Sequence, residues 1–244
     1  MHTTVAVFGS AEDDLASRLE PPLEALFTAL VQDPRLGEGL SIAHGSGPGV
    51  MRAADNAAVT LGLFRFGVGL GAEKLGQAPN LSPEALAQFT TLALNTRQDI
   101  LDRRSLFKIF TLGGFGTSYE INMALTFLKI GHCLPAPYLF FDPLGAGEDS
   151  GNLWAHALKQ FSIIACQAEN ACPDTPPLGP AWIARCCHPV QTWQNCLEII
   201  TGFMDNPAAY WQEVGIPIES VREARDSLIL AGTPIPPYVE AALG

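Results

Sequence analysis

Residues Lys108–Glu120 read KIFTLGGFGTSYE, a short apolar run that passes through three glycines into a helical pattern. Such a run predicts a buried strand. The glycines permit a tight turn, and a helix that starts there leaves free backbone N–H groups at its positive end. The stretch therefore predicts a strand–turn–helix unit of an α/β sheet, with an anion site at the turn.

Short apolar runs alternate with helical patterns along most of the chain, which is typical of a parallel sheet covered by helices. We therefore expect a Rossmann-like, doubly wound, mostly parallel α/β sheet with helices on both faces. The expected strands are Val5–Phe8, Leu40–Ala43, Phe64–Leu70, Phe89–Leu94, Lys108–Leu112, Tyr138–Phe141 and Trp182–Cys186.

Helices are predicted where apolar residues recur at positions i, i+3, i+4 and i+7. A fifth helix is expected to begin at Arg97 and to carry Arg103, Arg104 and Lys108. The four apolar stripes are Leu23–Leu30 after Pro21 and Pro22, Val50–Leu61, Ile121–Leu128, and Val190–Ile200 after Pro189.

The chain is expected to form one domain with an extension. Residues 1–204 form the nucleotide-binding domain, and residues 205–244 form a C-terminal extension with a helix around Ser220–Ala231 and a proline-rich finish. Gly145–Gly151 and Glu169–Pro180 are expected to be loops, because strand and helix patterns resume after each of them.

Composition excludes several classes of protein. The 244 residues are 48% hydrophobic and only 16% charged, which excludes a disordered chain. A net charge of −11 works against binding nucleic acid through a basic face. No apolar stretch is long enough to span a membrane, and the first residues lack the pattern of a signal peptide. We therefore expect a cytoplasmic protein that binds neither nucleic acid nor membrane.

The six cysteines are expected to be free and buried rather than paired or metal-bound. A reducing compartment keeps thiols free, and the spacings contain no CxxC pair. Cys186, Cys187 and His188 form the one cluster that suggests a metal, but neighbours on a strand point to opposite faces. No metal site is therefore predicted.

Three glycine-rich turns follow predicted strands, at Phe8–Ser10, His44–Gly49 and Leu112–Thr117. In an open α/β sheet, ligands bind outside the carboxyl ends of the strands. Gly67–Ala72 also matches the GxGxx[GA] dinucleotide fingerprint, but Gly76 and Pro79 follow in place of a helix. We interpret that match as a glycine-rich strand, and the three turns as a site for a nucleotide phosphate.

The segment LGGFGTSYE resembles the PGGxGTxxE motif of the LOG family of Rossmann-like phosphoribohydrolases. Arg97 stands where that family has the arginine of its MHxRK segment, and Gly45–Met51 resembles its GGGxxGxM turn. Phe8–Ser10 resembles its first glycine turn. The resemblance covers roughly residues 5–203, its later half only weakly.

The chain departs from the family motif at several positions. Leu112 replaces the proline of the motif, Gln98 replaces the lysine, and Asn95 and Thr96 replace Met-His. The altered residues could change a contact to the base or the phosphate. The resemblance nonetheless retains Arg97 and Glu120, the pair that the family uses for catalysis.

The resemblance implies a role for each site residue. A carboxylate at Glu120 would stabilise the ribosyl cation of N-glycosidic cleavage or orient the attacking water, although it could also be an ordinary helix-start charge. Arg97 would position a charged group, although it could belong to a solvated basic face. Ser10 could contact the ligand or cap the next segment. The residues expected to bind phosphate, sugar or base are Gly9, Ser10, Gly45, Ser46, Gly47, Gly113, Gly114, Gly116 and Thr117.

The sequence thus suggests a nucleoside 5′-monophosphate phosphoribohydrolase that acts on a purine-type, cytokinin-like nucleotide. Its ligand would be a small AMP-like molecule, and it would need no cofactor. The resemblance also implies a homodimer. Two alternatives are a non-catalytic carrier of a nucleotide or of the molybdenum cofactor, and a nucleotide-sensing regulatory protein. Retention of both Arg97 and Glu120 favours the enzyme.

Overall fold

A computed structural model describes residues 3–36, 39–70, 87–91, 93–145, 154, 157–161 and 180–244. Within them lies a seven-stranded sheet in which every pair of neighbours is parallel. The strand order is β4-β3-β2-β1-β5-β6-β7, which confirms the predicted Rossmann-like class. The strands are β1 (Thr3–Phe8), β2 (Leu40–His44), β3 (Phe64–Leu70), β4 (Ala87–Thr91), β5 (Phe107–Phe110), β6 (Tyr138–Phe141) and β7 (Cys187–Val190).

The strand order creates a switch point between β1 and β5. The chain builds outward from β1 to β4 and then returns to place β5 on the other side of β1. Connections on the two sides of such a point diverge, and open α/β sheets usually bind their ligands there, at the carboxyl ends of the strands. All three predicted glycine turns follow β1, β2 or β5, so the fold brings them to this edge.

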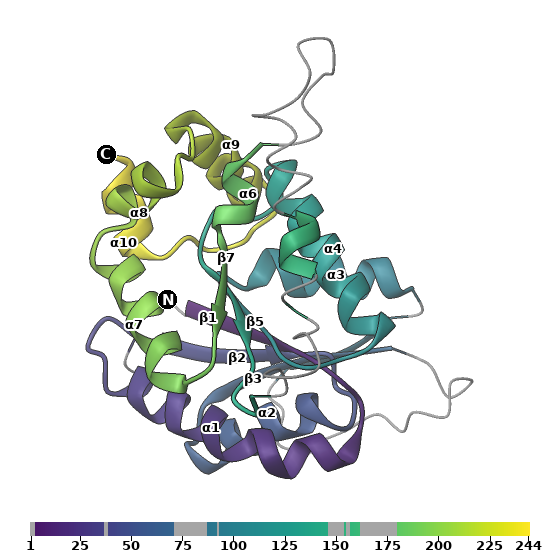
Figure 1. The fold of residues 1–244 in the computed structure, drawn as a ribbon. Coiled ribbons are helices and arrows are strands. Elements are labelled where there is room, and N and C mark those ends of the chain that lie inside the picture. Colours follow the sequence, from purple (N-terminus) through teal and green to yellow (C-terminus); the bar gives the residue numbers. More distant parts are fainter. Residues whose placement is uncertain are drawn as a thin grey trace.

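Helices cover both faces of the sheet (Figure 1). On one face, α1 (Asp13–Val31) packs against α2 (Val50–Thr60) and α7 (Trp193–Asp205). On the other, α3 (Leu94–Arg104) packs against α4 (Phe115–Lys129), and the short α6 (Trp182–Arg185) lies beside α4. The side chains of each strand alternate between these two layers.

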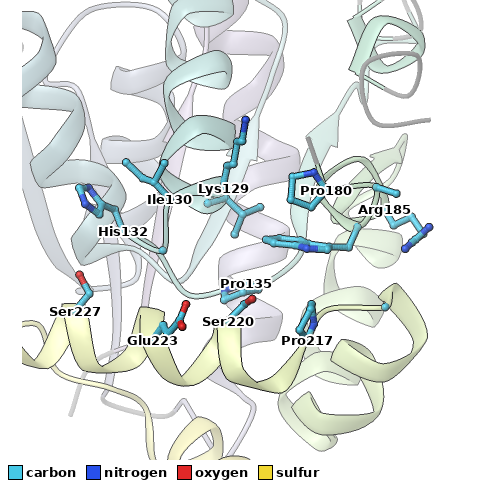
Figure 2. Close-up of a pocket in the computed structure, with 15 residues that line it drawn as sticks. Lys129, Ile130, His132, Pro135, Pro180, Arg185, Pro217, Ser220, Glu223 and Ser227 are labelled. Carbon is cyan, nitrogen blue, oxygen red and sulfur yellow. The ribbon is translucent and has the colours of Figure 1, made fainter. Parts of the chain in front are cut away.

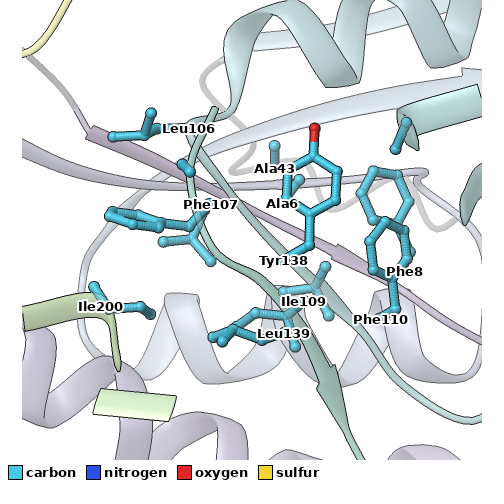
Figure 3. Close-up of a cluster of buried hydrophobic side chains, with 14 of the residues drawn as sticks. Ala6, Phe8, Ala43, Leu106, Phe107, Ile109, Phe110, Tyr138, Leu139 and Ile200 are labelled. Atoms are coloured by element: carbon cyan, nitrogen blue, oxygen red, sulfur yellow. The ribbon is translucent and has the colours of Figure 1, made fainter. Parts of the chain in front are cut away.

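The central strands are buried on both faces, as expected for a parallel sheet. In Figure 3, Phe107 and Leu139 lie on the side of Ile200 from α7, whereas Tyr138 and Phe110 lie on the opposite side. The Phe107 ring also meets Phe203 edge-on, with centroids 5.6 Å apart. This packing holds β5, and with it the turn that follows, in a fixed position.

Residues 205–244 contain α8 (Pro207–Val214), α9 (Ile218–Leu230) and α10 (Pro237–Leu243). The sequence predicted one helix here. Pro207 and Pro237 each stand in the first turn of a helix, where the missing N–H costs nothing. Trp211 is 1% exposed, and its indole N–H donates to the carbonyl of Pro135 at 2.8 Å. The extension therefore packs against the sheet domain, while the boundary at residue 204 stays a prediction.

Several predicted element boundaries were wrong. The helix predicted after Pro21 and Pro22 begins at Asp13 and contains both prolines, and Trp182–Arg185 is a helix rather than a strand. The last strand, β7, lies further along and contains Pro189, which the sheet tolerates because β7 is an edge strand.

Smaller shifts affect four other elements. Strand β4 ends at Thr91 rather than at Leu94, and β5 ends at Phe110 rather than at Leu112. Lys108 lies in β5 and not on the helix of Arg97, because that helix ends at Arg104. The last stripe forms a helix only from Trp193. Short apolar runs fit strands and buried helices equally well, so periodicity alone misplaces such boundaries.

Cys133, Cys186, Cys187 and Cys196 are free and buried, as predicted, whereas Cys166 and Cys172 lie outside the described residues. Among the described residues, no group of three or more histidine, cysteine or acidic side chains could hold a metal ion. None of the described helices is long and apolar enough to cross a membrane.

Candidate functional site at the carboxyl edge of the sheet

Backbone hydrogen bonds tie the three glycine turns together. The amide of Ser10 donates to the carbonyl of Leu112 at 2.9 Å, and the amide of Val50 donates to the carbonyl of Ser10 at 2.9 Å. A Cβ built on Gly9 would lie 2.2 Å from Oγ1 of Thr111 and 2.8 Å from the Val50 side chain. The turn after β1 therefore lies between the other two turns and contacts both. At position 9 only glycine fits without displacing the neighbouring side chains.

The turn after β5 leads directly into α4, which begins at Phe115. No described side chain caps this helix, so the backbone N–H groups of its first turn remain available. A Cβ on Gly114 or Gly116 would meet no atom within 4 Å, and the Phe115 side chain is 97% exposed. The structure thus presents an open helix N-terminus, which suits an anion.

Thr117 supports this turn from behind. Its side chain is buried, and a Cβ on Gly113 would lie only 2.0 Å from its Oγ1. Gly113 is therefore required for close packing, whereas Gly114 and Gly116 face open space. Ser10 adjoins the same turn, and its Oγ accepts a hydrogen bond from the amide of Glu12 at 3.1 Å. This contact stabilises the turn, but Ser10 does not cap α1, whose N-cap residue is Glu12. A contact of Ser10 with a ligand stays a prediction.

Arg97 and Glu120 meet, although they lie on different helices. Nη2 of Arg97 in α3 is 3.2 Å from Oε1 of Glu120 in α4. Their side chains are only 11% and 9% exposed, so neither belongs to a solvated charged face. The Nε of Arg97 is buried and has no hydrogen-bond partner in the described part of the chain.

Burial controls the proton on Glu120. Removal from water raises the pKa of this carboxyl to about 7; the positive charge of Arg97 opposes the rise, and the nearby Asp102 adds to it. Glu120 lies in the second turn of α4, beyond the turn where the helix dipole acts most strongly. Near neutral pH the group therefore exchanges a proton readily, which is the property required of a general base or acid.

The second turn, after β2, is filled by neighbouring side chains. A Cβ on Gly45 would lie 1.7 Å from Nη2 of Arg97, and one on Gly47 would lie 2.4 Å from Cε of Met51. Sδ of Met51 is 3.7 Å from the same Nη2 atom. The guanidinium of Arg97 thus packs against Gly45, and the Met51 side chain packs against Gly47.

Under this turn lies a buried polar network that the sequence analysis missed. Nδ1 of His44 accepts the amide N–H of Ser46 at 3.1 Å, and its Nε2 lies 3.2 Å from Oδ1 of Asp55. Arg65 reaches the same carboxylate oxygen at 3.1 Å. Ser46 itself has a φ of 53°, unusual for a residue other than glycine. The sequence signal that could have indicated this network is His44, a polar residue at the end of a mostly apolar strand.

Gln98 belongs to a second buried network behind α3. Its Nε2 donates to Oδ2 of Asp102 at 2.8 Å, and Nζ of Lys108 lies 3.9 Å from Oδ1 of the same residue. Gln98 is only 1% exposed. Gln98 therefore makes a contact within the protein. Asp102, which accepts this hydrogen bond, is close enough to Glu120 for its charge to raise the pKa of Glu120.

A cavity of about 670 Å³ lies away from these turns, between the end of α4, α6 and α9 (Figure 2). Figure 2 shows Ser220 and Glu223 rising from α9 toward it, whereas Lys129 points away from α9. None of the predicted site residues lines this cavity. Its volume alone does not make it the functional site, because the buried ionisable pair and the open helix N-terminus lie elsewhere.

The sequence matches no protein-family model and no curated protein. Solved structures do match. The molybdenum cofactor carrier protein MCP from Chlamydomonas reinhardtii superposes with a TM-score of 0.54 at 18% identity, over 84% of this chain and 100% of that one. The chain shares an α/β fold with it.

Two further matches give the same result. The protein TM1055 has a TM-score of 0.53 at 20% identity, over 82% of this chain and 99% of that one. The molybdenum cofactor binding protein from the phototrophic bacterium Rippkaea orientalis has a TM-score of 0.53 at 17% identity, over 84% and 98%. At these identities the likeness concerns the fold.

Proposed function

We propose that the protein is a nucleoside 5′-monophosphate phosphoribohydrolase, which splits a purine-type nucleotide into free base and ribose 5-phosphate. The observation that carries the proposal is the buried Arg97–Glu120 pair, 3.2 Å apart, at the switch point of the sheet. The uncapped start of α4 supports it as a site for the 5′-phosphate. The resemblance to the LOG family agrees with this assignment.

The reaction breaks the C1′–N bond, and the base leaves with the bonding electrons. Positive charge then builds on the ribose, where an ionised Glu120 would stabilise it. Water adds to C1′ and loses a proton, which a carboxylate with a pKa of about 7 accepts readily. The departing base takes up one proton, so that water is divided between ribose 5-phosphate and the free base. Arg97 would hold that carboxylate and a ligand oxygen with its planar fork of donors. The proposal requires no metal or redox cofactor.

The test is an assay for base release from a panel of nucleoside monophosphates, followed by chromatography. The wild-type protein and the nearly isosteric Glu120→Gln variant should be purified identically, so that a contaminating hydrolase appears in both. Release by the wild type and not by the variant would support the proposal. Equal release by both would reject it.

A second candidate function is that of a carrier that holds a phosphate-bearing ligand without cleaving it. Two neighbours of the same fold are named as carrier or binding proteins of the molybdenum cofactor. A carrier needs the open α4 terminus but not the Arg97–Glu120 pair. Measurable nucleotide binding without base release would favour this function.

Two expectations remain: the homodimer rests on the resemblance, and the cytoplasmic location rests on the sequence pattern of the first residues. We propose that the protein works as a homodimer in the cytoplasm. Sedimentation at micromolar concentration tests the dimer, and a monomer there would reject it.

A further inference from the structure

Asp142 is a buried acidic residue that none of the contacts described above satisfies. Asp142 is 2% exposed, and its Oδ1 atom has no hydrogen-bond partner in the described part of the chain. A carboxylate withdrawn from water without donors is strongly unfavourable, by several kcal/mol. Native proteins usually supply such a group with a partner, so an unpaired one calls for an explanation such as a functional role.

The register of the sheet places Asp142 beside the proposed phosphate turn. Phe110, the last residue of β5, pairs with Phe140 of β6, so Asp142 and the glycine turn each follow the carboxyl end of one of two neighbouring strands. Neighbouring strands are about 4.8 Å apart. On its other side the amide of Asp142 donates to the carbonyl of Val190 at 2.9 Å. The carboxylate therefore lies at the same edge of the sheet as the uncapped α4 terminus.

A cavity of about 390 Å³ opens at this position. Asp142 lines it together with the polar residues Gln191 and Asn195 and the apolar residues Phe140 and Ile199. A cavity that combines aromatic and aliphatic side chains with a few polar groups is typical of a small-molecule site. The cavity is one to two strand spacings from the β5 turn, or roughly 5–10 Å, a span that a mononucleotide bridges between its phosphate and its base.

An ionised carboxylate only accepts hydrogen bonds, and its two oxygens accept side by side. Its complement is a ring edge that presents an N–H next to an amino group, as guanine does. The pairing edge of adenine presents one donor and one acceptor, so it would leave an acceptor facing a carboxylate oxygen. We propose that Asp142 binds the base of the ligand and selects a guanine-type edge over adenine.

This inference rests on the proposed function, because it assumes a phosphate at the start of α4. It also narrows the ligand from a purine in general to one class of purine. The same edge chemistry occurs in other fused heterocycles that carry an amino group beside a ring N–H.

The experiment is titration calorimetry of the full chain with GMP, AMP, XMP and ribose 5-phosphate. The wild type should bind GMP about 5- to 150-fold more tightly than AMP, the discrimination typical of a bidentate base contact. In Asp142→Asn the amide presents one donor and one acceptor. GMP should therefore lose its advantage, and XMP, which carries a carbonyl in place of the amino group, should bind more tightly than to the wild type.

Asp226→Asn is the matched control, since it removes the same charge from an exposed carboxylate on α9. It should retain the wild-type preference for GMP, and thermal unfolding of both variants would verify the fold. Equal affinities for GMP and AMP in the wild type, or an unchanged preference in Asp142→Asn, would overturn the inference while leaving the proposed function intact. Failure of all four compounds to bind would overturn both.

Discussion

The turns after β2 and β5 have the same sequence character but opposite environments. In the β2 turn, Gly45 and Gly47 are covered by Arg97 and Met51, and His44 anchors the turn from below. In the β5 turn Gly113 is covered by Thr117, whereas Gly114 and Gly116 face open space. A glycine-rich turn can therefore serve close packing of a side chain or access for a ligand, and the sequence signature is the same in both cases.

The two turns would therefore have different roles in the site. The filled β2 turn fixes the guanidinium of Arg97, and the open β5 turn would receive the ligand. Glu120 lies between the two, held by Arg97 and carried on the helix that the β5 turn begins. Changes to each region should then have separable effects on turnover and on binding.

The largest effect is expected from Glu120→Gln. The amide keeps the size of the side chain but removes the negative charge that a cationic transition state needs. Turnover should fall by roughly 10²–10³, the loss typical of one electrostatic stabiliser, while nucleotide affinity changes little. Turnover and dissociation constant should be measured on one preparation. If affinity falls in parallel with turnover, Glu120 is a binding residue and the proposed mechanism is wrong.

Gly45→Ala tests the filled turn. Its new Cβ would lie 1.7 Å from Nη2 of Arg97, so the flexible end of that side chain must move while the backbone remains. A shift of this size at a catalytic group costs about 10²-fold in rate. We expect a folded protein with that loss in kcat. The matched control is Gly202→Ala, because a Cβ at Gly202 would meet no atom within 4 Å, and this variant should leave kcat unchanged. Gly62 is unsuitable as a control because its φ is positive, which would strain an alanine there.

Gly114→Ala tests the open turn and should produce a smaller change. Its Cβ meets no protein atom within 4 Å, so the free protein should unfold at the wild-type temperature. A ligand phosphate approaching the helix N–H groups would meet the new methyl group and lose part of its charge-assisted bonding. We expect affinity for AMP to fall about tenfold, with no change for adenosine. Unchanged AMP affinity would place the phosphate elsewhere.

The smallest effect is a pH dependence that follows from the raised pKa of Glu120. If the ionised form is the active one, kcat/KM should reach a plateau above pH 7, because the pKa is about 7. It should fall by about fivefold from pH 7 to pH 6 as the carboxyl takes up its proton. A profile flat over this range would mean that Glu120 does not titrate in catalysis.

The carboxyl group of Glu120 should affect stability in the opposite direction to activity: activity rises with pH, whereas its contribution to the stability of the folded protein falls. Its pKa in the folded protein, about 7, lies above the usual value of 4.5. The folded state therefore retains the proton longer, and the resulting stabilisation is complete below pH 4.5 and is lost as pH rises through 7. In Glu120→Gln this part of the pH dependence should disappear, which urea unfolding at pH 5 and pH 8 would measure.

Most of the fold could be predicted from local patterns in the sequence. Alternation of strand and helix predicted the Rossmann-like class, which the structure confirms, and β3 and β6 have the predicted bounds. The misplaced elements were short or contained proline, as at Trp182 and Pro21, where packing outweighs local preference. The roles of the site residues stay predictions.

The sequence by itself determined the order of the elements and the placement of glycines at strand ends, because periodicity and backbone freedom are properties of neighbouring residues. Only the tertiary structure decided that Arg97 meets Glu120, that one turn is filled and the other open, and that β6, which Asp142 follows, lies next to β5. Those facts depend on which strands are neighbours in the sheet and on how helices pack across it. Strand order is set by the burial of the whole core, so no single segment of the sequence contains it.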